Sequence, residues 1–81
     1  MNYKNLINKE VRIHWDDSNG YHGWISKELV DTNIAHCRSW GLLIAETEES
    51  LTIVFGDSDC GSVMNSLAIP KSCIKSVKEL H

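Results

Sequence analysis

The chain has 81 residues, enough for one domain, and a chain of this length buries only a little over ~60% of the surface it exposes when unfolded. A deep active site is therefore not expected, and a sizeable ligand site would lie in a surface groove or between the subunits of a homo-oligomer. The formal net charge of −3 argues against a nucleic-acid binder, because such proteins normally carry a basic stripe. No apolar run approaches the ~20 residues of a membrane span, so we expect no membrane partner.

Thiols and imidazoles are the side chains that would hold a metal or act as nucleophiles. The cysteines are Cys37, Cys60 and Cys73. They include no Cys-x-x-Cys pair and no secretory signal precedes them, which is typical of reduced thiols in a cytosolic protein. His14, His22 and His36 lack the spacing of zinc ligands, and no thiol lies in a known nucleophile motif. We therefore expect no metal, no cofactor and no catalytic residue, and a protein that is not an enzyme.

The first regular element is a strand over residues 10–15. Val11, Ile13 and Trp15 alternate with polar residues, which predicts one face in the core and the other in solvent. Residues 16–20 follow as a turn, because aspartate, serine and asparagine bond to their own backbone and glycine accepts a positive φ.

The two flanking segments are less regular. Residues 1–9 form a lead-in whose Leu6 and Ile7 are expected to cover one end of the core. Residues 21–40 are interpreted as a long ordered loop with at most one helical turn, since their apolar pairs are spaced about one turn apart.

A hairpin over residues 41–47 and 50–56 is the clearest strand signal, with Glu48 and Glu49 at its tip. The predicted core residues of its second strand are Leu51, Ile53 and Phe55. They are faced from the first strand by Leu42 and Ile44, or else by Leu43 and Ala45.

The chain closes with a polar connection over residues 56–62, a strand over 64–69, and a turn led by Pro70. For the last segment we predict a short 3₁₀ turn and a bulged strand, because Ile74 and Val77 are β-branched. Five short strands in one domain (residues 1–81) predict an all-β, five-stranded barrel that closes on itself and so removes its sheet edges.

This order of elements resembles the Src-homology-type (SH3-like) and Sm-like small β-barrels, with a long first loop and a 3₁₀ turn before the last strand. Four segments, residues 15–16, 23–24, 37–43 and 67–74, are similar to small uncharacterised proteins encoded by phages and prophages. That resemblance implies a barrel fold and the cytoplasm of a host cell. It also implies an accessory factor that acts by binding, such as an inhibitor of host defence or a sponge for its nucleotide signals.

The aromatic residues point to a candidate ligand site, because five of the six lie in the first half of the chain. Flat rings stack on ligands, and an arginine can bind a phosphate or carboxylate through two hydrogen bonds. The predicted ligand-binding residues are Tyr21, His22, Trp24, Arg38 and Trp40. Two alternatives stay open: Trp24 and Trp40 belong either to the core or to a binding surface, and Arg38 is either a surface ion pair or a ligand clamp. Lys71, Lys75 and Lys78 are interpreted as a solvated charged face.

Two functions follow as hypotheses. The first is a non-catalytic counter-defence factor of phage type that sequesters a small anionic, nucleotide-like host ligand. The alternative is an inhibitor or adaptor that binds a host protein through an aromatic groove or a barrel edge.

Overall fold

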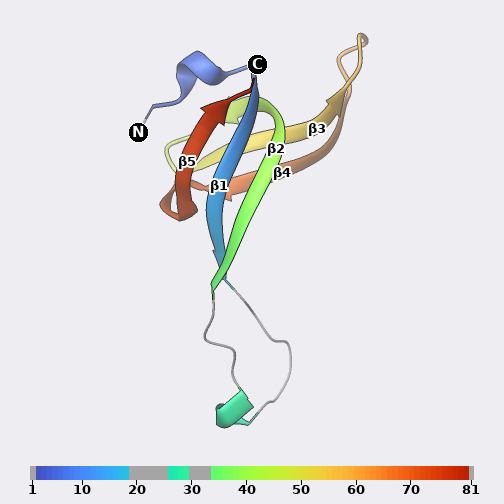
Figure 1. The fold of residues 1–81 in the computed structure, drawn as a ribbon. Helices are drawn as coiled ribbons and strands as arrows, with labels where there is room; N and C mark the ends of the chain where they lie inside the picture. Colours follow the sequence, from blue (N-terminus) through green and yellow to red (C-terminus); the bar gives the residue numbers. More distant parts are fainter. Residues whose placement is uncertain (1, 19–25, 30–33, 81) are drawn as a thin grey trace.

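Five antiparallel strands form one sheet in the computed structural model, which describes residues 2–18, 26–29 and 34–80 (Figure 1). The strands are β1 (Glu10–Ser18), β2 (Ile34–Glu46), β3 (Ser50–Asp57), β4 (Val63–Pro70) and β5 (Ile74–Glu79). Three 3₁₀ turns accompany them, η1 (Lys4–Leu6), η2 (Lys27–Leu29) and η3 (Lys71–Cys73), and the described residues contain no α-helix. The prediction of an all-β fold with five strands is confirmed.

The sheet has the order β4-β3-β2-β1-β5, so β1 to β4 pair consecutively in sequence order, and β5 pairs with β1. β4 and β5 are its two edges, and the sheet is open, so the predicted closure into a barrel is not shown. In Figure 1, β3 and β4 cross β1 and β5 at a steep angle, with the long strand β2 between the two groups. A register shift between Leu43 and Ala45 marks the place where β2 changes its pairing with β3.

The core lies between these two groups of strands. Its buried side chains are Val11, Ile13, Leu43, Leu51, Ile53, Ile69 and Ile74. Burying each such side chain stabilises the fold by about 1.5–3 kcal/mol, before the cost of ordering the chain. Leu6, Ile7 and Trp15 pack against this core as predicted, and Leu43 is the core residue of the two alternatives for the hairpin.

The first hairpin is longer than the sequence pattern indicated. The turn predicted to begin at Asp16 is wrong, because Asp16 and Asp17 still pair with β2, opposite His36 and Ala35. The loop interpretation is likewise wrong from Ile34 onward, where β2 begins. A ladder of backbone hydrogen bonds extends the strands here, and it does not require apolar side chains. Of the residues between β1 and β2, the structure describes 26–29, which contain the single turn η2.

Phe55 was predicted to lie in the core, and this is wrong: its side chain is 48% exposed, whereas Val54 is 1% exposed. Val54 pairs with Leu42 on the face of the sheet opposite Ile53, so β3 buries apolar residues on both faces. The far ends of β3 and β4 project past the other strands in Figure 1.

The C-terminal elements agree with the sequence prediction. η3 directly follows Pro70, and the pairing of β5 with β1 contains a register shift between His14 and Trp15. Strand β4 carries one irregularity: Asn65 has φ of 50°, a left-handed conformation that is uncommon for any residue but glycine. The ladder with β3 pairs Ser66 with Val54 and then Met64 with Gly56, on either side of this residue.

Candidate ligand-binding face

The outer face of β1, β2 and β5 gathers half of the lysine and arginine side chains that the sequence scatters. Because Val11 and Ile13 point into the core, the residues that alternate with them point to the opposite face. Residues paired across the three strands form rows on this face. In the first row, Arg12 lies opposite Trp40 of β2 on one side and Lys78 of β5 on the other. One row further along, His14 lies opposite Arg38 and Ser76.

The third row pairs Asp16 with His36, and Lys75 reaches the same carboxylate from β5. We call the basic face the set of seven side chains Arg12, His14, His36, Arg38, Trp40, Lys75 and Lys78. It holds four of the eight lysines and arginines, whereas Asp16 is the one carboxylate of eleven in these three rows. An acidic chain therefore presents a locally cationic surface.

Arg38 and Trp40 form the exposed centre of this face. The guanidinium carbon of Arg38 lies 5.8 Å from the centroid of the Trp40 ring, within the range of a cation–π contact. Trp40 is 48% exposed, so the alternative that places it in the core is wrong. Among the described residues, no carboxylate forms an ion pair with Arg38. Its guanidinium therefore keeps donors available for a ligand.

Two nitrogens on the basic face have no hydrogen-bond partner among the described residues. They are Nε of Arg12 and Nε2 of His14, and both are covered from solvent. A covered donor without an acceptor costs free energy. Nε of Arg12 is a donor, whereas Nε2 of His14 donates or accepts according to its tautomer, and the protein covers both atoms.

Asp16 acts as a local counter-ion at one end of the face. Its Oδ1 lies 2.7 Å from Nδ1 of His36, and its Oδ2 lies 3.5 Å from Nζ of Lys75. The hydrogen bond with His36, and then the charge of Lys75, hold the pKa of Asp16 below its ordinary value against the opposing effect of burial. These groups line a depression of about 190 Å³ together with His14, Trp15, Cys37 and Arg38.

An apolar groove of about 360 Å³ adjoins the basic face at Trp40. Leu42 and the buried Val54 pair across β2 and β3 within it, and the exposed Phe55 contributes to its lining. Its lining residues are Glu10, Trp40, Gly41, Leu42, Val54, Phe55, Gly56, Asp57 and Leu80. The backbone N–H of Leu80 donates to the carbonyl of Glu10 at 2.8 Å, which ties the end of the chain to β1.

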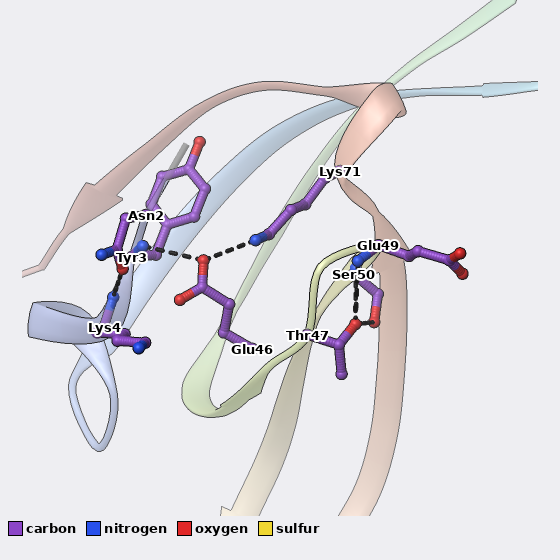
Figure 2. Close-up of polar contacts among 8 residues, drawn as sticks. All are labelled: Asn2, Tyr3, Lys4, Glu46, Thr47, Glu49, Ser50 and Lys71. Carbon is purple, nitrogen blue, oxygen red and sulfur yellow. Dashed lines mark hydrogen bonds and ion pairs between the residues drawn. The ribbon is translucent and has the colours of Figure 1, made fainter.

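A second polar cluster, around Glu46, is structural (Figure 2). Its Oε2 accepts hydrogen bonds from Nζ of Lys71 at 2.8 Å and from the backbone N–H of Tyr3 at 3.0 Å. The hydrogen bond from Lys71 is the main cause that lowers the pKa of Glu46. This carboxylate therefore joins the lead-in, the tip of the β2–β3 hairpin and η3.

Cys60 lies at the exposed tip of the β3–β4 hairpin. The hydroxyl of Ser58, 3.0 Å from its Sγ, is the largest influence that lowers its pKa, to about 7. All three cysteines are free. The residues that the structure describes contain no group of three or more histidines, cysteines or carboxylates placed to hold a metal ion.

The predicted ligand residues divide into two groups. Arg38 and Trp40 lie side by side on the basic face, whereas Tyr21, His22 and Trp24 lie outside the described residues. The sequence reasoning missed Arg12 and His14 as site residues, and it assigned Lys75 and Lys78 to a solvated face. The alternation of residues 10–15 was the signal that could have found the first two, since it already placed them opposite the core.

Comparisons of the chain with models of protein families, with curated proteins and with solved structures find no match. In the described part of the chain, no helix has the length and apolar character needed to cross a membrane. The function proposed next therefore rests on the geometry of the basic face.

Proposed function

We propose that the protein is a non-catalytic binding protein that captures a small anionic, nucleotide-like ligand on the basic face. One observation carries this proposal: an acidic chain places four of its eight lysines and arginines in three neighbouring rows of one face, beside one exposed tryptophan and with a single carboxylate among them. A solvated face with no ligand would have no physical reason to concentrate like charges in neighbouring rows, because cross-strand like charges destabilise a sheet.

The chemistry of the central residues favours a phosphate bound beside a flat ring. Arginine presents a planar fork of donors that matches two phosphate oxygens, and Arg38 has no competing carboxylate among the described residues. The exposed ring of Trp40 is a stacking platform for a base next to that phosphate. Arg12 and Lys78, in the same row as Trp40, would hold further anionic oxygens.

The wider setting is part of the same proposal. The strand order and the 3₁₀ turn before β5 support an open barrel of the SH3-like type. The resemblance to phage-encoded proteins supports a ligand made by the host cell, and hence a counter-defence role. Tyr21, His22 and Trp24 belong to the segment that joins β1 to β2, and we include them in the proposed site.

The test is isothermal titration calorimetry with inorganic tripolyphosphate, ATP, GTP and a cyclic dinucleotide. At least one should bind, and Arg38→Ala should weaken that binding by about tenfold or more, because a charge-assisted bond to phosphate is lost. Lys4→Ala is the matched control, since it removes an exposed cation that lies away from the basic face. Equal losses in the two variants, or no loss in Arg38→Ala, would contradict the proposed site.

A second candidate function is favoured by a different surface. Val63 and Met64, at one end of the edge strand β4, are 53% and 57% exposed. An edge strand with exposed apolar side chains is a place where another protein can add a strand. On this alternative, Met64→Lys should abolish recovery of a host protein in a pull-down while leaving tripolyphosphate binding unchanged.

A further inference from the structure

We propose that the apolar groove beside the basic face receives the base of a purine nucleotide that carries an exocyclic amino group. The groove and the basic face then form one site, with the base in the groove and the phosphates on the cations. This inference rests on the proposed function and adds to it the chemical class of the ligand.

The groove and the basic face adjoin each other at Trp40. Trp40 belongs to both regions, because it lines the groove and lies opposite Arg12 across the strands. The next row, in which Glu10 lies opposite Leu42, belongs to the groove. Neighbouring rows on one face of a sheet are ~6.8 Å apart, which is two strand residues. A nucleotide that spans the distance between two neighbouring rows can place its base in the apolar groove and its phosphate beside the cations.

The shape and polarity of the groove fit a flat heterocycle. Its volume of about 360 Å³ is small for a peptide helix and sufficient for a two-ring base with its sugar. Leu42 and the exposed Phe55 supply apolar surface, and the Trp40 ring offers one face for stacking. Base–aromatic stacking tolerates any base, so these residues alone would not select among nucleotides.

The selectivity comes from two carboxylates. Glu10 and Asp57 are both exposed and both line the groove. An ionised carboxylate only accepts hydrogen bonds, so it favours a base with amino donors and disfavours one that presents carbonyl oxygens. The amino groups of adenine and guanine are such donors, whereas hypoxanthine lacks the amino group.

The same carboxylates fix the direction in which the ligand lies. Negative charge at Glu10 and Asp57 repels phosphate from the groove, while Arg12, Arg38 and Lys78 attract it one row away. A nucleotide can therefore satisfy both regions in one orientation only.

The experiment compares ligands that differ by one group. GTP is measured against ITP, and ATP against the triphosphate of purine riboside, with tripolyphosphate as the phosphate-only probe. We expect at least one amino-bearing nucleotide to bind about tenfold or more tightly than its deamino counterpart, and to bind more tightly than tripolyphosphate. Quenching of tryptophan fluorescence should accompany nucleotide binding and be lost in Trp40→Leu.

Variants assign the effect to the groove. Glu10→Gln and Asp57→Asn should reduce the preference for the amino-bearing nucleotide and leave tripolyphosphate binding unchanged or slightly tighter. Glu48→Gln, at the exposed tip of the β2–β3 hairpin, is the matched control and should change neither. Circular dichroism melts confirm that each variant is folded.

The outcomes separate the two proposals. If nucleotides bind no more tightly than tripolyphosphate, or deamino and amino forms bind equally, the groove assignment is overturned and the anion-binding function stands. If neither tripolyphosphate nor any nucleotide binds the folded wild-type protein, the proposed function fails and the groove assignment fails with it.

Discussion

Cys60 shows how a short loop sets the chemistry of a single residue. Its thiol is exposed, and hydroxyls of Ser58 and Ser62 lie 3.0 and 3.7 Å from Sγ. Hydrogen bonds donated to sulfur favour the thiolate over the thiol, which explains a pKa of about 7 in place of 9.0. The other two cysteines are partly buried and lack this arrangement.

We predict that alkylation of Cys60 by iodoacetamide reaches half of its maximal rate near pH 7, because the thiolate is the nucleophile. Ser58→Ala removes the main hydrogen bond, so the midpoint should move to higher pH and the rate at pH 7 should fall. Intact-mass spectrometry over a pH series measures both. Cys60→Ser identifies the labelled residue, and an unchanged midpoint in Ser58→Ala would show that Ser58 does not set the pKa.

Gly41 shows a residue whose small size the packing requires. A Cβ placed there would lie 2.7 Å from the carbonyl oxygen of Val54 and 3.2 Å from Cβ of Ile53. Real atoms do not approach so closely, so β2 passes this part of β3 only with glycine. The sequence pattern placed Gly41 at the start of a strand and gave no reason for its identity, because the contact comes from a strand that pairs later.

At the scale of elements, the carboxylate of Glu46 connects three segments that are distant in sequence. Lys71 and the backbone of Tyr3 both donate to it (Figure 2). These bonds hold the pKa of Glu46 below its ordinary value of 4.5. A lowered pKa in the folded state means that the stabilisation is complete above pH 4.5 and is lost as the pH falls through the lowered value.

We therefore expect Glu46→Gln to lower the melting temperature at pH 7 and to flatten its decline between about pH 5 and pH 2. Thermal melts followed by circular dichroism at several pH values provide the test. Asp16 has a pKa shifted in the same direction, so some acid dependence should remain in the variant. Glu48→Gln should retain the wild-type pH dependence, and an equally steep acid decline in Glu46→Gln would contradict this account.

The alternation of apolar residues predicted the parts of β1 and β3 in which large side chains face the core. It did not predict the first part of β2, whose inward side chains are small. In β2, the inward residues before Gly41 include Cys37 and Ser39, which are small because Trp15 occupies the space between the strands. The indole N–H of Trp15 donates to Ser39 at 3.0 Å. A strand whose inward side chains are small and polar shows no hydrophobic alternation in its sequence. The first part of β2 therefore forms a strand only through its pairing with β1.

For the whole molecule, net charge was a poor guide to surface charge. The value of −3 argued correctly that the chain is acidic overall, but it carries no information on where the charges lie. Arg12, Arg38 and the lysines of β5 come from three strands that are distant in sequence, and they meet because β1 pairs with β2 on one side and β5 on the other. The candidate site was therefore half visible from sequence: Arg38 and Trp40 were selected by residue type, and the rest required the pairing of strands.

We predict that binding of tripolyphosphate weakens steeply as sodium chloride rises from 50 to 500 mM, since the Debye length falls from ~14 to ~4 Å over this range. Lys78→Ala should reduce the slope of log affinity against log salt, and Lys4→Ala should leave it unchanged. Calorimetric titrations at four salt concentrations give the slope. Binding that does not depend on salt would exclude the basic face as the site.

The left-handed backbone at Asn65 bears on whether the protein self-associates. An open sheet exposes the unpaired amides and carbonyls of its edge strands, and a straight apolar edge invites aggregation. At Asn65, directly after the exposed Val63 and Met64, the backbone of the edge strand β4 departs from regular strand geometry. A second copy can find a regular template there for only a few residues. The other edge, β5, has only six residues and carries Lys75 and Lys78, so the cations that we assign to the ligand also discourage self-association.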